Sequence, residues 1–212
     1  MKPNRILIVG CARSGNTLML YLMTEGFGGM ERQVGETGEV VPEAKPGVVA
    51  VGKFPRRASI LDEIGLLDQE DLGIIYMMRD PRDVLTSLHP AKPNNYWVQP
   101  ARWKREAQAA LKFQSHERVL LVRFEDLLKE PALSQERIAR KFDLKIAMPF
   151  AEAHSWTPKS EGDMINVTAM HGIRPLDPAE IGSWQDNEKD RTHVEHCLWD
   201  MQLVTLMKQF GY

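Results

Sequence analysis

The sequence predicts an α/β fold in which a central parallel sheet is flanked by helices. Four short runs of apolar, mostly β-branched residues recur along the chain, and the segments between them have the periodicity of amphipathic helices. Strands that alternate with helices favour parallel pairing, because each crossover helix returns the chain to the same end of the sheet. With 212 residues, 43% of them hydrophobic and 26% charged, we expect one domain over residues 1–212.

Each expected element follows from a local pattern. The four apolar runs predict buried strands at Arg5–Gly10, Gly47–Gly52, Leu72–Met78 and Arg118–Phe124. Helical spacing predicts helices at Thr17–Glu25, Ser59–Leu67, Pro81–Leu88, Trp97–Gln114, Leu133–Phe142 and Thr192–Phe210. The range Pro149–Trp184 is rich in proline, glycine and polar residues, and predicts a long ordered loop. Loops over the carboxyl ends of parallel strands are where such sheets bind ligands.

Charge and cysteine content narrow the class of protein. A formal net charge of −2 gives no general attraction to nucleic acid or to anionic membranes, so a positive site has to be local. The two cysteines, Cys11 and Cys197, are too few for a disulfide framework and indicate a reduced compartment. The apolar run after Lys2 and Arg5 is too short for a secretory signal, and no run approaches the roughly 20 residues that span a bilayer. We therefore expect a cytoplasmic protein.

The loop "ARSGNT" joins the first expected strand to the first expected helix. The first N–H groups of a helix have no internal partner and its dipole is positive there, so a loop in this place commonly holds an anion. Ser14 is expected to cap the helix and Gly15 to let the backbone approach a ligand, while Arg13, Asn16 and Thr17 add donors. The loop is not a Walker A sequence, because Asn16 stands where the lysine would be. Taken alone, these residues also suit an ordinary strand–turn–helix connection.

The segment "RDPRDVLTS" gives a sharper signal after the third expected strand. Asp80 is a good N-cap, Pro81 suits the first helical position, and Asp83 lies in the first turn. Arg79 is left at the end of the strand, and Ser87 follows about two turns, or roughly 10 Å, further along the helix. Arg79 and Ser87 can therefore bind one phosphate together. The simpler alternative pairs Arg79 with Asp80 or Asp83 and leaves Ser87 solvated.

The motifs together resemble those of one family. In order and spacing, "RSGNTLML", "RDPRDVLTS" and "VRFEDLLKEP" resemble the sulfotransferases that use 3′-phosphoadenosine 5′-phosphosulfate (PAPS), and the similarity runs from Ile6 to the terminal "FGY". The segments "FEDLL" and "IGSW" support it. The resemblance implies a P-loop-like nucleotide-binding architecture. It assigns the 5′-phosphosulfate to the loop Arg13, Ser14, Gly15, Asn16 and Thr17, and the 3′-phosphate to Arg79 and Ser87.

Other positions match the family more loosely. Phe124 stands where many members have a tyrosine before "ED", which keeps an aromatic wall beside the adenine and loses a hydroxyl. By the same resemblance, Trp156 and Arg174 would complete the nucleotide site. Lys53, in "VGKFPRR", matches the lysine that some glycan and bacterial members place two residues before a proline, next to the transferring sulfuryl group. Members that act on small phenols and alcohols have a catalytic histidine at this strand end, and this sequence does not.

The implied reaction needs positive charge at the leaving oxygen and a base for the acceptor hydroxyl or amine. Arg13, Lys53 and the helix N-terminus would supply the charge without a metal. His89 is the first candidate for the base, and Glu36 and Glu39 are the others. Catalytic roles are thus expected for Arg13, Lys53 and His89.

Several alternatives remain open at the level of sequence. The loop "ARSGNT" also resembles the flavodoxin loop that holds flavin mononucleotide (FMN) in electron-transfer proteins. A P-loop phosphotransferase or nucleotide kinase is disfavoured by the missing lysine, and a sulfotransferase-like binding protein without activity fits the absent histidine. The segments Gly26–Pro46 and Ala91–Gln99 are expected to line the acceptor pocket, but their composition does not separate a glycan from a lipid or a small molecule.

Overall fold

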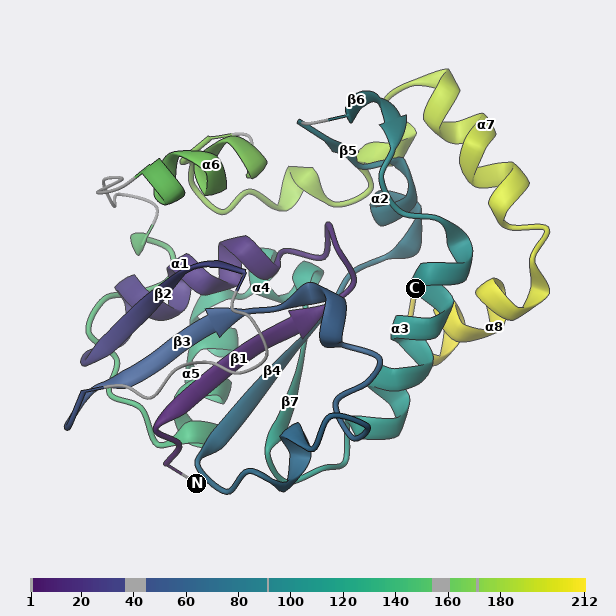
Figure 1. The fold of residues 1–212 in the computed structure, drawn as a ribbon. Helices are drawn as coiled ribbons and strands as arrows, with labels where there is room; N and C mark the ends of the chain where they lie inside the picture. The colour runs from purple at the N-terminus through teal and green to yellow at the C-terminus, as the bar shows by residue number, and fades with distance from the viewer. Residues whose placement is uncertain (1, 37–44, 91, 154–160, 171) are drawn as a thin grey trace.

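A five-stranded parallel sheet forms the centre of the molecule (Figure 1). The computed structural model describes residues 2–36, 45–90, 92–153, 161–170 and 172–212. The sheet has the order β2-β3-β1-β4-β7, with β1 (Arg5–Gly10), β2 (Met30–Glu36), β3 (Val49–Lys53), β4 (Leu72–Met78) and β7 (Val119–Arg123). Two further strands, β5 (Leu88–His89) and β6 (Lys92–Tyr96), pair antiparallel with each other beyond the carboxyl end of the sheet.

Helices cover both faces of this sheet (Figure 1). The helices on the two faces are α1 (Asn16–Gly26), α3 (Pro100–Phe113), α4 (Phe124–Lys129), α5 (Pro131–Phe142) and α8 (Met201–Gln209). Three others, α2 (Pro81–Thr86), α6 (Glu161–Ala169) and α7 (Glu188–Cys197), lie beyond the carboxyl edge of the sheet. In the part of the chain that the structure describes, no helix has the length and apolar character needed to cross a bilayer.

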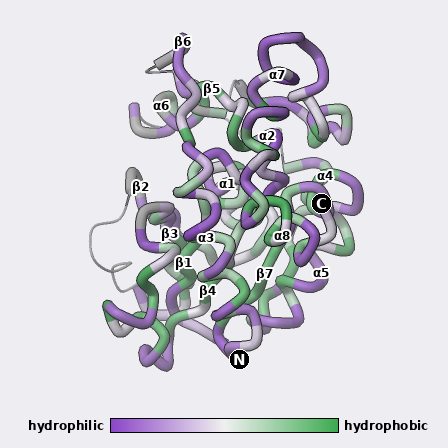
Figure 2. The backbone as a smooth tube through the Cα atoms, turned by 90° about the vertical axis from the view of Figure 1, so that its right-hand side faces the viewer, coloured by the Kyte–Doolittle hydropathy of each residue, from purple (hydrophilic) through white to green (hydrophobic). Residues whose placement is uncertain are grey.

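The alternation of side chains along β1 shows how the core is divided. Leu7 and Val9 point to one face and pack with α3 and α8, while Ile6 and Ile8 point to the other and pack with α1, α4 and α5. Both faces are buried, which explains why the strand reads as a continuous apolar run. In Figure 2 the central strands are largely hydrophobic and α7 is largely hydrophilic. The sheet is thus a rigid base whose carboxyl edge carries the loops.

The predicted parallel sheet is confirmed, and all four predicted strands are present within two residues of their expected bounds. The sequence did not predict β2. Its segment "MERQVGE" pairs on one side only, with β3, and its polar residues give no apolar run because the strand lies at the edge of the sheet. It falls within Gly26–Pro46, one of the two segments expected to line the acceptor pocket.

Two predicted helices are wrong. The range Ser59–Leu67 forms turns and a short 3₁₀ segment at Leu66–Asp68, because Gly65 has the left-handed φ of 68° that ends a helix. The range Thr192–Phe210 is divided between α7 and α8. The break falls at Asp200, whose side chain accepts hydrogen bonds from the N–H groups of Gln202 and Leu203 and so starts a new helix.

The remaining differences lie around the site. The helix predicted at Pro81–Leu88 ends at Thr86, and the one predicted at Trp97–Gln114 begins at Pro100, since β5 and β6 occupy the chain between them. The range Pro149–Trp184 is not a continuous loop, because it contains α6.

Candidate nucleotide-binding site

A cavity of about 600 Å³ lies at the carboxyl edge of the sheet, between the loops that follow the strands. This volume is in the range of small-molecule and cofactor sites. The predicted site residues that line it are Arg13, Gly15, Asn16, Thr17, Lys53, Arg79, Ser87 and His89. Phe124 and Arg174 line it as well. The structure therefore brings together residues that the sequence separates by more than a hundred positions.

The first loop, residues 12–17, differs in one respect from its prediction. Gly15, not Ser14, is the N-cap of α1, and no side chain caps the helix. Ser14 is fully buried and does not line the cavity, and its hydroxyl oxygen has no hydrogen-bond partner among the described residues. Gly15 is required by its φ of 89° and by packing, because a Cβ atom there would lie 2.6 Å from the Phe124 ring. The capping role of Ser14 is therefore wrong.

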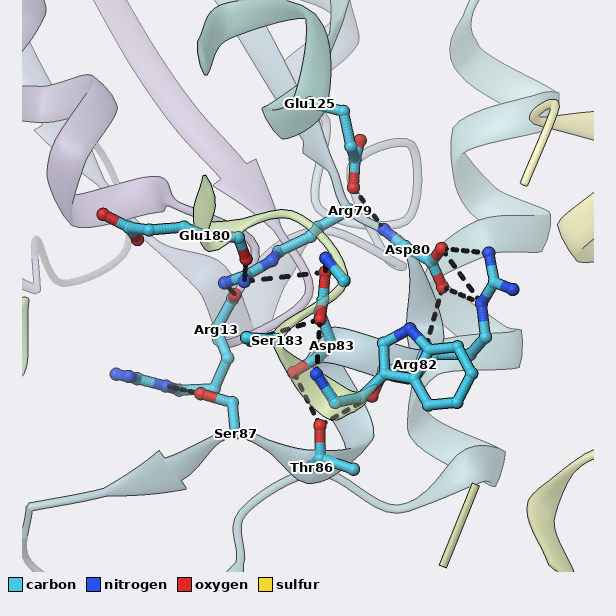
Figure 3. A network of polar contacts seen from close by, with 12 residues as sticks. Arg13, Arg79, Asp80, Arg82, Asp83, Thr86, Ser87, Glu125, Glu180 and Ser183 are labelled. Carbon is cyan, nitrogen blue, oxygen red and sulfur yellow. Dashed lines mark hydrogen bonds and ion pairs between the residues drawn. The ribbon is translucent and has the colours of Figure 1, made fainter. Parts of the chain in front are cut away.

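Arg13 connects the first loop to the second loop, residues 79–87 (Figure 3). Its Nε donates to the Ser87 hydroxyl at 2.8 Å, and its backbone oxygen accepts from Nη1 of Arg79 at 3.4 Å. Its own φ is 71°, a strained value for a residue with a side chain. Burial, with a smaller effect of Arg79, lowers the pKa of Arg13 to about 10. Both arginines line the same cavity, and their positive charges favour the binding of an anion there.

The second loop confirms the predicted helix start. The Asp80 carboxylate accepts from the backbone N–H of Arg82 at 2.8 Å and caps α2, and Pro81 takes the first helical position. The backbone N–H of Asp80 donates to Glu125 at 2.8 Å, and the indole N–H of Trp103 donates to the backbone oxygen of Arg79 at 3.1 Å. Hydrogen bonds with α3 and α4 thereby fix the chain just after the end of β4.

Asp83 gives the motif "IGSW" a physical role (Figure 3). This buried carboxylate accepts from the backbone N–H groups of Gly182 at 2.9 Å and Trp184 at 3.2 Å, and from the Ser183 hydroxyl at 3.3 Å. It also lies 3.8 Å from Nη2 of Arg79. The pairing of Arg79 with Asp83, which the simpler alternative predicts, is therefore confirmed. Arg79 nevertheless also lines the cavity.

The guanidinium of Arg79 lines the cavity and is held by neighbouring groups. Its guanidinium lies 4.3 Å from the centre of the Phe124 ring, and its Nη2 donates to the backbone oxygen of Glu180 at 3.4 Å. Its Nε is buried and has no hydrogen-bond partner in the described part of the chain. A buried donor without a partner costs free energy, which an anion bound at this place would recover.

Lys53 and His89 line the same cavity as Arg13. Lys53 ends β3 and is only 9% exposed. The His89 ring stacks on Trp97 with 4.3 Å between ring centres. Burial lowers the pKa of His89 below its usual 6.5, and the nearby positive charges of Arg13 and Lys53 lower it further. The imidazole is thus neutral at pH 7 and able to accept a proton.

The side chains of three predicted residues lie outside what the structure describes. Glu39 and Trp156 lie outside the described residues. For Glu36 the structure gives the backbone alone, which pairs in register with Lys53. Arg174 is 41% exposed, and its Nε donates to Glu180 at 2.8 Å.

Sequence reasoning missed Arg102 as a cavity residue, whereas Trp97 lies in Ala91–Gln99, a segment expected to line the acceptor pocket. Arg102 lies in the first turn of α3, where an arginine in a helical pattern reads as a solvated charge, and only the packing of the helix directs it into the cavity. Within the described ranges, no cluster of three or more His, Cys, Asp or Glu side chains is arranged to hold a metal ion.

Comparison with known proteins agrees with this geometry. Residues 66–154 match the family model of the sulfotransferase domain, a range that includes the second loop and "FEDLL". None of the curated proteins matches the chain significantly in sequence.

Solved structures share the fold over nearly the whole chain. The sulfotransferase domain of the Synechococcus PCC 7002 olefin synthase has a TM-score of 0.69 at 14% identity, over 100% of this chain and 96% of that one. The sulfotransferase domain of the curacin biosynthetic pathway has a TM-score of 0.67 at 16% identity, over 99% of this chain and 98% of that one. Mouse sulfotransferase SULT7A1, complexed with adenosine 3′,5′-bisphosphate (PAP), has a TM-score of 0.60 at 13% identity, over 99% of this chain and 90% of that one.

These findings confirm the resemblance to sulfotransferases that the motifs predict, and with it the α/β fold. They give no support to a flavodoxin-like protein or to a phosphotransferase.

Proposed function

We propose that the protein transfers a sulfuryl group from PAPS to a hydroxyl or amine of an acceptor and releases PAP. The observation that carries the proposal is the set of cations Arg13, Lys53 and Arg79 around one cavity at the start of α1. Such a set, beside a helix N-terminus, suits a ligand with several negative charges. The sulfotransferase family match supports the same reaction.

The residues present fit a nucleotide that carries phosphate at two places. The first loop and the N–H groups of α1 suit the 5′-phosphosulfate, and Arg79 with Ser87 suits the 3′-phosphate. The unpartnered Nε of Arg79 is the feature of the structure that an anion would complete. Phe124, which packs against both Gly15 and Arg79, offers an aromatic surface on the same side of the cavity.

The chemistry then follows from charge. The acceptor oxygen forms a bond to sulfur, the bond between sulfur and the bridging oxygen breaks, and its electron pair stays on the phosphate of the leaving nucleotide. Arg13 and Lys53 stabilise that developing charge because they are fixed and mostly removed from water. His89 takes the proton of the acceptor, since its lowered pKa keeps the imidazole neutral at pH 7. In this proposal positive side chains stabilise the leaving group, and no metal takes part.

We further propose that the protein acts in the cytoplasm as one domain over residues 1–212. The free thiols of Cys11 and Cys197 agree with a reducing compartment. The acceptor is a small molecule or a glycan.

Ligand class is the direct test of this function. PAP at a hundred times its Kd should stabilise the protein by about 2.7 kcal/mol, which a thermal melt without magnesium detects as a higher Tm. FMN should leave the Tm unchanged. If ATP raises the Tm, that rise should not depend on magnesium. Stabilisation by FMN alone, or by ATP only with magnesium, would contradict the proposal.

A further inference from the structure

The cavity extends beyond the residues assigned to the nucleotide. Sheet order places β4 and β7 on one side of β1 and β3 on the other, so that Arg79 and Phe124 border one part of the cavity and Lys53 and Pro55 the other. A donor that binds along β1, β4 and β7 leaves the β3 side for the acceptor, because in-line attack comes from the side opposite the leaving group. His89 lines the same cavity as Lys53, and the charges of Arg13 and Lys53 both lower the pKa of its imidazole.

Arg102 brings one more positive charge to this cavity, from the first turn of α3. Its side chain is half-buried and, within the described part of the chain, makes no hydrogen bond or ion pair. Its charge opposes part of the rise that burial causes in the pKa of the Cys11 thiol, just after β1. Glu106 lies one turn further along the same helix, does not line the cavity, and has a pKa raised to about 7 by burial. Glu106 thus offsets only part of the charge of Arg102 at neutral pH.

The other cations of the cavity have assigned contacts. Arg13 donates to Ser87, Arg79 lies beside Asp83, and Arg174 donates to Glu180. Lys53 also lines the cavity and is assigned above to the leaving oxygen. Glu180 is the one carboxylate among the cavity-lining residues that the structure describes. Arg102 is accordingly the cation that the nucleotide-binding arrangement does not use.

We propose that the acceptor is a hydroxy acid, whose carboxylate is bound by Arg102 and whose hydroxyl lies beside Lys53 and His89. This inference rests on the proposed function and names its substrate class. A planar carboxylate suits the two-pronged guanidinium, and it needs such a cation because the phosphosulfate of the donor repels a second anion. The stacked rings of His89 and Trp97 give the acceptor an apolar wall on the same side.

Paired probes test the proposal without any need for turnover. Calorimetric titration of the PAP complex compares 4-hydroxyphenylacetate with 4-hydroxyphenylacetamide, and 3-hydroxyhexanoate with its amide. Members of each pair have the same hydroxyl and nearly the same shape. We expect at least one acid to bind about tenfold or more tightly than its amide, since a charge-assisted bond is lost in the amide. Transfer of labelled sulfuryl from PAPS should show the same preference in kcat/KM.

Variants of two arginines on one helix identify the contact. Arg102→Gln should abolish the preference for the acid and leave the affinity for PAP unchanged, and Arg102→Lys should keep part of it. Arg105→Gln is the matched control, because Arg105 is exposed and does not line the cavity, and it should bind the acids like the wild type.

Three outcomes would overturn the inference: equal binding of acid and amide, no binding of either member of both pairs, or a preference that survives in Arg102→Gln. A loss of PAP affinity in Arg102→Gln would assign Arg102 to the nucleotide instead and equally reject it. Failure of the wild type to bind PAP is a different result, which rejects the proposed function itself.

Discussion

The two loops that form the nucleotide site are built in opposite ways. In the first loop, Arg13 has a strained backbone, and the Ser14 hydroxyl and the Asn16 side-chain oxygen are buried without partners in the described structure. In the second loop, Asp80 and Asp83 hold the helix start and the "IGSW" segment through hydrogen bonds at 2.8–3.3 Å. The first loop thus leaves buried polar groups without partners and a strained backbone, whereas the second is held by contacts within the protein.

Because of this difference, substitutions in the two loops should have different effects. A substitution in the second loop should first affect folding, unless it removes Arg79 or Ser87, whose side chains reach the cavity. A substitution in the first loop or at Lys53 should first affect the reaction. The predictions below test that division.

The largest effect is expected for Asp83→Ala. The substitution removes the acceptor of three hydrogen bonds and leaves Arg79 without its buried acid, so the free energy of unfolding should fall by about 3 kcal/mol or more. Urea denaturation at pH 7 measures the loss. Asp62→Ala is the control, because the pair that Asp62 forms with Lys112 is exposed, and it should leave the midpoint almost unchanged. Equal midpoints for Asp83→Ala and the wild type would show that the second loop does not depend on Asp83.

The next largest effect is expected in turnover. Arg13→Ala and Lys53→Ala should each lower kcat by about 10² to 10³, because they remove charge that matters most when the leaving oxygen becomes negative. Donor Kd should rise far less than kcat falls. Steady-state kinetics together with PAP titration separates the two, and a raised donor KM with unchanged kcat would make both residues simple binding contacts.

His89→Asn tests the base through pH. The neutral imidazole is the active form, so in the wild type kcat/KM should be level above pH 6.5 and fall as the pH drops through the lowered pKa of His89. The variant should lose about 10²-fold in kcat and lose this acid limb. His116→Asn, far from the cavity-lining set, is the control and should keep the wild-type profile. An acid limb that persists in His89→Asn would point to Glu36 or Glu39 as the base.

A smaller effect is expected for Ser87→Ala. The hydroxyl is a neutral group that already accepts from Arg13, so its loss should weaken PAP binding by a few-fold, about 1 kcal/mol or less. Calorimetric titration gives the value. A loss as large as that of Arg79→Ala would mean that Ser87 mainly positions Arg13.

Local rules explain what the sequence could predict. Asp80 and Pro81 fix the start of α2 within a few residues, and the buried strands appear as apolar runs, so the fold and the place of both loops follow from neighbouring residues. The edge strand β2 has no such run and was missed.

What the sequence could not predict depends on contacts between distant residues. Asp83 meets Gly182 and Trp184 about a hundred positions away, and Arg13 meets Ser87 across 74 positions. Ser14 looked like a helix cap, but tertiary packing buries it and gives that place to Gly15. The role of Arg102 likewise depends on where α3 packs, which no local pattern encodes.

We propose that the second loop recognises a 3′-phosphate through Arg79. Titration of PAP and of AMP, which lacks that phosphate, into the wild type should give a preference for PAP of at least about tenfold, since a charge-assisted arginine–phosphate bond contributes about 1.5–3 kcal/mol. Arg79→Ala should lose much of the preference. Arg82→Ala should keep it, because Arg82 pairs with Asp80 and does not line the cavity. Equal affinity of the wild type for PAP and AMP, or a preference unchanged in Arg79→Ala, would contradict the account.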